Sequence, residues 1–367
     1  MTIQLRRGLG VTLAALSLVG GLAACGSGDT ATTTSSNGTG DGSCPSGSLA
    51  AEGSSAQKNA IEEAIASFGE NCLDADISYN PTGSGAGIKQ FVAGQVDFAG
   101  SDSALNADKG EVAAAQQRCG ANPAWNLPMA AGPIAISYNL PGVDSLVLTP
   151  AAAAGIFSGS ITTWNDPAVA AANPGVTLPS GKITVFFRSD ESGTTENFTK
   201  YLKAAAPTSW TAEPAKKWTG TGEGREKSAG VADGVKQTEG SVTYVEWSYA
   251  KDNKLGIAKI DNGGGPVELT GQSAGEAVSV AKVTGEGNDL RLSLDYATKA
   301  PGTYPIVLVT YEIVCSKGLD PAKTALEKAF LTHFASTDVQ KGLEEIGYAP
   351  LPADVTAKVE TAIAAIS

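Results

Sequence analysis

The pattern of hydrophobic and polar positions predicts short strands alternating with helices in the first part of the chain. Residues 48–53 are expected to form a strand that ends at a glycine, and residues 55–68 carry apolar side chains at helical spacing. Brief strands are expected at residues 77–79 and 96–99, with a helix between them that ends at Gly94. Three successive passages from strand to helix predict an α/β unit with a largely parallel sheet.

A second α/β region is expected to follow. The apolar segment 133–138 predicts a strand long enough to cross between two lobes, and residues 183–187 predict a strand that leads through a loop into a helix. Residues 220–240 are rich in Gly, Lys and Glu and are expected to be mostly loop with a short helix. Residues 241–247 alternate in character, as a strand does.

The strongest strand signal is the run from Tyr304 to Val314. It is expected to return the chain to the first lobe, which helices at residues 325–334 and 355–366 complete. The pattern therefore predicts an α/β protein with two lobes. The first comprises residues 48–132 and 308–367, and the second comprises residues 136–305.

The beginning of the chain is typical of an export signal. Arg6 and Arg7 precede an apolar run, residues 9–24, which is too short and too rich in Gly and Ala for a confident membrane span. The run ends in Leu22-Ala23-Ala24-Cys25, which is similar to the bacterial lipobox, whose cysteine is acylated. Residues 1–24 are therefore expected to be a lipoprotein signal peptide, although an ordinary secretory signal with a chance cysteine is the alternative.

An acylated Cys25 would hold the protein at the outer face of the cytoplasmic membrane, because two acyl chains give stable anchoring. The following residues, 25–47, are almost devoid of apolar side chains. Such a segment cannot bury enough surface to fold, so a flexible tether is expected here.

The cysteines outside the lipobox suggest two disulfides, because four remain in an exported chain: Cys44, Cys72, Cys119 and Cys315. Three pairings are possible. Cys44–Cys72 with Cys119–Cys315 is favoured, since the first two cysteines flank a strand and a helix at the same end of one βα unit. A zinc site is not expected, because there is no Cys-x-x-Cys and His333 is the sole histidine. No metal or cofactor is predicted.

The net charge of the chain limits the classes of ligand that it can bind. A formal net charge of −12 over 367 residues argues against nucleic-acid binding, which depends on Lys and Arg displacing counterions. The same charge would repel any small anion. If an anion is bound, local dipoles and one well-placed cation must hold it.

Three predicted junctions between a strand and a helix share one composition. They are Gly53–Ala56, Gly83–Gly87 and Ser189–Thr194, each with glycine and hydroxyl residues at a helix start. Unpaired backbone N–H groups and the helix dipole make such a position an anion site. Each loop alone is more simply read as a helix cap, but three at the carboxyl ends of predicted strands favour a binding site.

Two charged residues sharpen this interpretation. Arg188 directly precedes the third loop and can pair bidentately with an oxyanion. Asp102 follows a strand at the same expected edge, and an ionised carboxylate only accepts hydrogen bonds. Asp102 suits an anion that still carries a hydrogen, as hydrogen phosphate does and sulfate does not. Its alternative roles are a helix cap or a structural partner of Arg188.

Four motifs in order resemble the phosphate-binding lipoproteins of Pst phosphate importers, the PstS family. They are Gly53–Gln57, Thr82–Gly87, Asp97–Asp102 and Phe187–Thr194, and the similarity extends over nearly all of the mature chain. The resemblance implies a two-lobed, type II periplasmic binding protein with two crossover strands. It also implies high-affinity binding of inorganic phosphate and its delivery to the permease and ATPase subunits of an ABC importer.

The resemblance assigns phosphate ligands to both lobes, so that the ion would favour a closed state. Some family members have Thr-Phe where this chain has Ser55-Ala56, a change that keeps the hydroxyl and the backbone donor. The matching positions are Ser54, Ser55, Ala56, Ser84 and Asp102 in the first lobe, and Arg188, Ser192, Gly193 and Thr194 in the second.

Three alternatives remain open. The chain could be a receptor for another tetrahedral oxyanion, or a surface lipoprotein with an adhesive role. It could instead be a serine hydrolase using Ser84 or Ser192. The hydrolase is disfavoured, because Thr82 and Ala86 replace the glycines of a Gly-x-Ser-x-Gly elbow and His333 lies in a predicted amphipathic helix. The protein is therefore expected not to be an enzyme.

Overall fold

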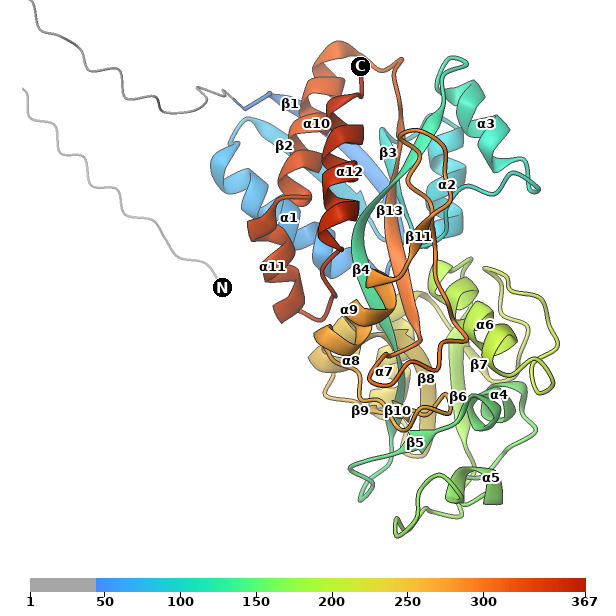
Figure 1. Cartoon of the computed structure of the whole chain (residues 1–367). Helices are drawn as coiled ribbons and strands as arrows, with labels where there is room; N and C mark the ends of the chain where they lie inside the picture. Colours follow the sequence, from blue (N-terminus) through green and yellow to red (C-terminus); the bar gives the residue numbers. More distant parts are fainter. Residues whose placement is uncertain (1–43) are drawn as a thin grey trace, which may run out of the picture. The chain divides into compact units, whose positions relative to one another are not determined.

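The structure is a computed structural model that describes residues 44–367 (Figure 1). The predicted signal peptide, the predicted lipidation site Cys25 and most of the predicted tether lie outside the described residues. The end of the predicted tether lies within them: Cys44 is bonded to Cys72, and the first strand already begins at Gly47. None of the helices in this part of the chain combines the length and apolar character that a bilayer span requires.

The described residues alternate between strands and helices, as the sequence pattern predicts. The strands are β1 (Gly47–Gly53), β2 (Ala75–Asn80), β3 (Phe98–Ser101), β4 (Ala124–Asn139), β5 (Val147–Leu148), β6 (Thr184–Arg188), β7 (Glu223–Arg225), β8 (Ser241–Glu246), β9 (Gly256–Ile257), β10 (Lys259–Ile260), β11 (Lys282–Val283), β12 (Leu292–Ser293) and β13 (Val307–Cys315). The helices are α1 (Lys58–Asn71), α2 (Ser84–Val92), α3 (Glu111–Arg118), α4 (Pro150–Ser158), α5 (Pro167–Ala170), α6 (Gly193–Ala205), α7 (Lys227–Gln237), α8 (Trp247–Asp252), α9 (Gly271–Ser279), α10 (Pro321–Phe334), α11 (Thr337–Glu345) and α12 (Ala353–Ala364).

The main strands form one mixed sheet in two halves. The order is β2-β1-β3-β13-β4-β8-β6-β7, with β9 added beside β4. β1 runs parallel to β2 and β3, and β6 runs parallel to β7 and β8, whereas β13 and β4 are antiparallel to their neighbours. Helices α10 and α12 lie near one face of the first half and α2 and α3 near the other (Figure 1). Parallel strands are normally covered in this way, because both faces are apolar.

The long strand β4 joins the two halves. Its residues Ala124 to Pro133 pair with β13, and from Ile134 onward the partner is β8. The chain returns near the same place, where the Tyr304 hydroxyl donates to the Ile134 carbonyl at 2.9 Å and the Ile134 N–H donates to the Ile306 carbonyl at 2.8 Å. These two crossings confirm the predicted fold class, an α/β protein of two lobes.

Each half has its own apolar core. In the first half, Leu49 of β1 and Phe98 of β3 belong to the same buried cluster as Phe330 of helix α10. The second half contains an aromatic cluster in which the rings of Phe198 and Tyr244 stack with centroids 4.5 Å apart. Separate cores allow each half to hold its loops in place independently of the other.

Both favoured disulfides are confirmed. Cys44–Cys72 joins the residues before β1 to the end of α1, and Cys119–Cys315 joins the end of α3 to the end of β13. Both bonds lie within the first half, and each joins the end of a helix to the end of a strand segment.

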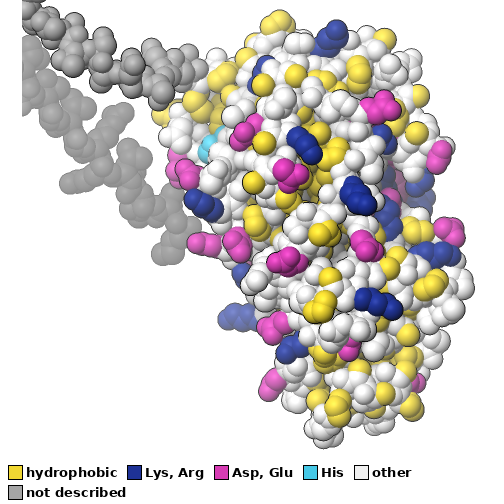
Figure 2. All heavy atoms as spheres, in the orientation of Figure 1, with side chains coloured by type: hydrophobic (Ala, Val, Ile, Leu, Met, Phe, Trp, Pro, Cys, Tyr) yellow, Lys and Arg dark blue, Asp and Glu magenta, His cyan; other side chains and the backbone are white. Residues whose placement is uncertain are grey.

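The surface carries charges of both signs. Figure 2 shows basic and acidic side chains interspersed over one face of the molecule. On this face the net charge of −12 is therefore not gathered into one acidic patch, and local groups decide what each site can bind.

Candidate functional site

The loops that follow β1 and β3 meet at the edge where the two strands end. Gly53 and Gly100 are partners in the parallel register, and the Ser54 N–H donates to the Gly100 carbonyl at 2.8 Å. The Gly83 N–H donates to the Gly53 carbonyl at 2.6 Å, which sets the first turn of α2 beside the same loop. Gly53 has φ +150° and an added Cβ would lie 1.9 Å from the Gly100 oxygen, so only glycine fits this contact.

Asp102 is the centre of a cluster of hydroxyl groups. Its Oδ1 accepts from the Ser54 hydroxyl at 2.6 Å and from the Thr310 hydroxyl at 2.9 Å, and its Oδ2 accepts from the Ser84 hydroxyl at 3.1 Å. Its own N–H donates back to the Ser84 oxygen at 3.1 Å. The carboxylate is thus held by three segments of the first half: the loop after β1, the start of α2, and β13.

Burial raises the pKa of Asp102 to about 6, and the negative charge of Glu246 adds to this effect. The hydrogen bonds from Ser54, Thr310 and Ser84 oppose the shift, because they stabilise the ionised form. At neutral pH the side chain is therefore an ionised acceptor with little access to water.

The start of α6 approaches this cluster from the second half of the sheet. A Cβ added to Gly193 would lie 2.5 Å from the Ser84 oxygen and 2.6 Å from the Asp102 Cβ, so the backbone of the helix start passes directly against both residues. Asn197 fixes the approach: its amide donates to the Asp102 carbonyl at 2.7 Å and to the Gly193 carbonyl at 2.9 Å. Ser192 caps the helix by accepting from the Thr195 N–H at 3.1 Å.

Arg188 extends from β6 into the same region and is buried. Its Nε and Nη2 donate to the two carboxylate oxygens of Asp190 at 2.7 and 2.5 Å, and its Nη1 donates to the hydroxyls of Thr194 at 3.2 Å and Ser228 at 3.1 Å. Burial alone would lower the pKa of Arg188, but the hydrogen bonds and charge of Asp190 raise it above its usual value. The guanidinium is therefore a fixed cation.

The expectation that the fork of Arg188 faces an oxyanion is corrected by this arrangement. Asp190, two positions further along the chain, occupies the fork with both of its carboxylate oxygens. The remaining nitrogen, Nη1, donates to hydroxyl groups and is the part of the guanidinium that is left for the candidate anion site. The alternative of a structural pair between Arg188 and Asp102 is not the arrangement found, since the hydrogen-bond partners of the Asp102 carboxylate are hydroxyl groups.

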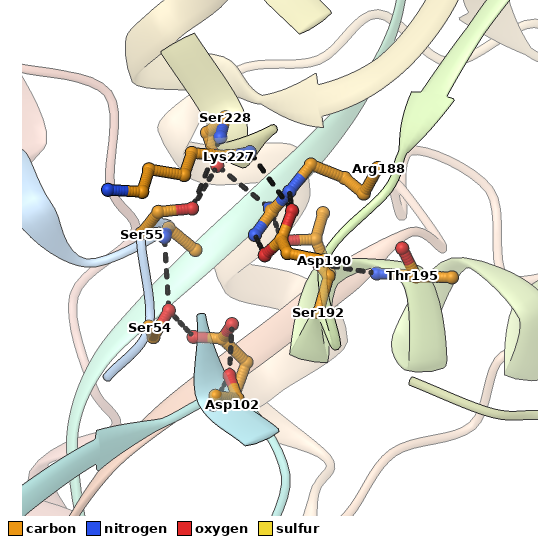
Figure 3. A network of polar contacts seen from close by, with 12 residues as sticks. Ser54, Ser55, Asp102, Arg188, Asp190, Ser192, Thr195, Lys227 and Ser228 are labelled. Atoms are coloured by element: carbon orange, nitrogen blue, oxygen red, sulfur yellow. Dashed lines mark hydrogen bonds and ion pairs between the residues drawn. The ribbon is translucent and has the colours of Figure 1, made fainter. Parts of the chain in front are cut away.

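The two halves also meet at Ser55. Its hydroxyl lies 2.9 Å from the hydroxyl of Ser228, and its oxygen accepts from the Ser228 N–H at 3.1 Å (Figure 3). Figure 3 shows Ser54 and Ser55 between Asp102 on one side and Arg188 with Ser228 on the other. The structure therefore brings the predicted positions together at one buried place: Ser54, Ser55, Ala56, Ser84, Asp102, Arg188, Ser192, Gly193 and Thr194.

Comparison with known proteins gives the same family as the motifs. Residues 30–338 match the family model described as PBP superfamily domain. Phosphate-binding protein PstS 3 of Mycobacterium tuberculosis is 47% identical over 324 residues, which cover 87% of this chain and 86% of that protein. Phosphate-binding protein PstS 2 of the same organism is 43% identical over 371 residues and covers 99% of both chains. The chain belongs to the PstS family of phosphate-binding proteins.

Solved structures place the PstS-family fold of this chain among periplasmic binding proteins. The phosphate-bound structure of a high-affinity periplasmic phosphate-binding protein, PfluDING, superimposes with a TM-score of 0.68, covering 86% of this chain and 93% of that chain. At 21% identity this similarity concerns the fold alone. Together with the sheet order, it confirms the type II binding-protein architecture that the PstS resemblance implies.

Sequence reasoning missed four polar residues that contact the predicted ligand positions of this PstS-family chain. Ser228 lies in residues 220–240, where loop with a short helix was expected, and its only signal was a serine near the start of what is α7. Thr310 lies inside the strongest strand signal, so the pattern predicted only a core position. Asn197 and Glu246 carried no motif, and only the three-dimensional structure shows that they contact Asp102 and Thr194.

The geometry gives no support to the serine hydrolase alternative in this PstS-family chain. The Nε2 of His333 lies 2.8 Å from the hydroxyl of Ser67 on α1, on the first half of the sheet. The Ser84 hydroxyl contacts Asp102, and the Ser192 hydroxyl oxygen caps α6. A nucleophile needs a base within hydrogen-bond reach, and neither serine has the histidine as its partner.

Proposed function

We propose that this protein is the extracytoplasmic phosphate receptor of an ABC phosphate importer, and that it binds the ion without changing it chemically. The observation that carries the proposal is the convergence of the loop after β1, the starts of α2 and α6, Asp102 and Arg188 at one buried place. Helix starts supply N–H donors and positive dipole ends there, and hydroxyl groups add further donors. A buried cation then offsets the charge of the ion.

The ligand set is proposed to be the one that the family motifs carry onto this chain. In the first lobe it comprises Ser54, Ser55, Ala56, Ser84 and Asp102, and in the second lobe Arg188, Ser192, Gly193 and Thr194. Asp102 would accept the hydrogen of hydrogen phosphate, a bond that sulfate cannot offer at neutral pH. A buried acceptor left facing an unprotonated oxyanion costs binding energy, and this would reject sulfate.

The lobes are proposed to be residues 48–132 with 308–367, and residues 136–305. The change of partner along β4 at Pro133–Ile134 supports these bounds. Phosphate that touches both lobes would favour the closed state by its difference in affinity for the closed and open states. The importer permease would recognise that closed form. We further propose that Cys25 is acylated and holds the protein at the outer face of the cytoplasmic membrane.

Isothermal titration of the purified protein, dialysed free of phosphate, with phosphate, sulfate and molybdate tests the proposal. We expect one phosphate per protein, and sulfate binding weaker by about 10⁴-fold. Equal affinity for sulfate or molybdate would instead assign the protein to receptors for other oxyanions. An absence of heat with all three anions would overturn the proposed function.

A further inference from the structure

Residues 289–298 form a bridging segment that contacts both halves of the molecule. At its first end, the Asp289 carboxylate accepts from the backbone and the side-chain N–H groups of Asn126 on β4, at 3.0 and 2.7 Å. At its other end, the Thr298 carbonyl accepts from the side chain of Asn262 in the second half, at 3.0 Å. The bridging segment therefore crosses the junction between the halves, although its sequence falls within the range proposed for the second lobe.

The first end of the bridging segment is fixed close to the part of the chain that carries Asp102. Leu290 is buried in the apolar cluster of the first half, and its N–H donates to the Asn126 carbonyl at 3.0 Å. The Oδ1 of Asn126 accepts from the N–H of Leu105 at 2.9 Å, three residues after Asp102. One asparagine of β4 thus holds both the bridging segment and the loop that follows β3.

Between these two ends, Tyr296 of the bridging segment contacts the first turns of α6. Its hydroxyl donates to the Oδ1 of Asn197 at 2.5 Å. The side-chain nitrogen of Asn197 donates to the Asp102 carbonyl at 2.7 Å, across the lobes, and to the Gly193 carbonyl at 2.9 Å. The Asn197 side chain is buried, and both its oxygen and its nitrogen are used in these contacts.

The hydroxyl of Tyr296 sets the orientation of this amide. Without it, the Oδ1 of Asn197 would lose the donor that it has in the structure and would remain a buried acceptor, which costs free energy. The amide could relieve that cost by rotating, and its nitrogen would then leave the carbonyls of Asp102 and Gly193. The bond that joins the start of α6 to the first lobe therefore depends on a residue that lies outside the loops of the anion site.

We propose that Tyr296 is a positioning residue for phosphate binding: it holds the Asn197 amide in its bond to Asp102 and thereby slows release of the ion from the closed lobes. The inference rests on the proposed function, because it concerns the dissociation of the same ion. In this role Tyr296 acts through Asn197 and not on the ion itself. The ion enters the open form, in which the bond between the lobes is not yet made, so the association rate should not depend on the hydroxyl.

The variant Tyr296→Phe removes the hydroxyl and keeps the ring. Release of radiolabelled phosphate, chased with excess unlabelled phosphate, should be about three- to tenfold faster than in the wild type. The Kd from isothermal titration should rise by the same factor, so that the association rate is unchanged. Tyr138→Phe is the matched control, because the buried Tyr138 also donates to one acceptor, the Val143 carbonyl at 3.2 Å, but within the second lobe. It should keep the wild-type release rate.

A double-variant cycle separates positioning from a merely structural role. Asn197→Ala should speed release about tenfold, because it removes the bond to Asp102. Adding Tyr296→Phe to Asn197→Ala should have no further effect, since the hydroxyl acts through the amide. Thermal melts show whether each variant folds.

Three results would overturn the inference while leaving the proposed function intact. They are a wild-type release rate in folded Tyr296→Phe, effects of the two variants that multiply in the double variant, and a slower association rate that accounts for the whole change in Kd. A wild-type release rate in Asn197→Ala would also overturn it, whether or not Tyr296→Phe folds. A wild-type protein that binds no phosphate would instead refute the proposed function.

Discussion

In the proposed ligand set, Asp102 is the residue that would make the site selective for a protonated anion. A carboxylate in an anion site is unfavourable unless the ligand brings a hydrogen to it. The hydroxyls of Ser54, Ser84 and Thr310 hold the side chain in one position, and burial with the nearby Glu246 raises its pKa to about 6. Below that pH the group becomes protonated and can donate instead of accept.

Two changes should therefore weaken the discrimination between phosphate and sulfate. We expect Asp102→Asn to raise the relative affinity for sulfate by about a hundredfold, since the amide can donate to an unprotonated oxygen. Lowering the pH from 7.5 to 5 should act in the same direction on the wild-type protein. Competition titrations with the two anions measure both effects. Unchanged selectivity in Asp102→Asn would contradict the role assigned to this carboxylate.

Glu327 provides a test of buried charge outside the site. Burial raises its pKa to about 8, with the negative charge of Asp97 adding to the effect and Arg118 opposing it. Because folding raises this pKa, the protonated Glu327 side chain contributes fully to the stability of the folded state at pH values below its pKa in the unfolded chain. This contribution is lost as the pH rises through 8.

Glu327→Gln should therefore stabilise the protein at pH 8.5 by about 1–3 kcal/mol, with little effect near pH 5. Thermal or denaturant unfolding at the two pH values measures the difference. Glu63→Gln, at an exposed glutamate on α1, is the control and should change stability little at either pH. Equal effects of Glu327→Gln at both pH values would show that the carboxyl does not titrate as described.

At the scale of elements, sequence reasoning worked best where apolar periodicity was regular. The strands β1, β6 and β13 lie within a few residues of the predicted ranges, because glycine and hydroxyl residues mark where they end. Helix α4 was missed, since nearly all its side chains are buried and no polar face reveals a helical period. Helix α7 was undervalued because Gly230 and Gly234 lowered its apparent helix propensity.

The loops of the candidate site could also be predicted from local sequence. Glycine and serine at a helix start form a pattern that is visible within a few residues. Contacts between distant residues have no such signature, so Ser228 and Glu246 were not found. The use of the Arg188 fork by Asp190 was also missed, because the sequence shows which groups are near each other and not which of them pair.

The helix start at Gly193 allows a sharp test at this scale. Gly193→Ala would place a Cβ within 2.6 Å of both the Ser84 oxygen and the Asp102 Cβ, so the loops must separate. We expect phosphate affinity to fall about ten- to hundredfold, as for an overpacked contact of 1–3 kcal/mol. Gly275→Ala on α9 is the control, since its Cβ would meet nothing within 4 Å. Isothermal titration of both variants gives the comparison, and unchanged affinity in Gly193→Ala would place the ion elsewhere.

Across the whole molecule, a charged pair at the edge of the site joins the proposed lobes. Lys89 on α2, in the first lobe, contacts Glu191 of the second lobe at 2.6 Å, and Lys217, also in the second lobe, contacts the same carboxylate at 3.3 Å. The Gly85 N–H also donates to the Glu191 carbonyl at 2.9 Å. Because the lysines are largely exposed, these pairs contribute modestly and weaken with salt.

Loss of this bridge should speed the opening of the closed form. We expect Glu191→Gln to raise the rate of phosphate release about two- to fivefold at low salt, with the difference shrinking at high salt. Stopped-flow displacement measures the rate. Glu213→Gln is the matched control, because Glu213 pairs with Lys203 within the second lobe at 3.0 Å. Equal release rates for Glu191→Gln and wild type at low salt would exclude a role for the bridge in closure.

A crystal structure of the protein grown with phosphate would show directly whether the ion lies between the two lobes. We expect one ion enclosed between the Ser54–Ala56 loop, Ser84 and Asp102 on one side and Arg188 with the Ser192–Thr194 turn on the other. An oxygen of the ion should lie within hydrogen-bond distance of the Asp102 carboxylate. An ion bound at any other place, or these turns facing open solvent with no ion between them, would contradict it.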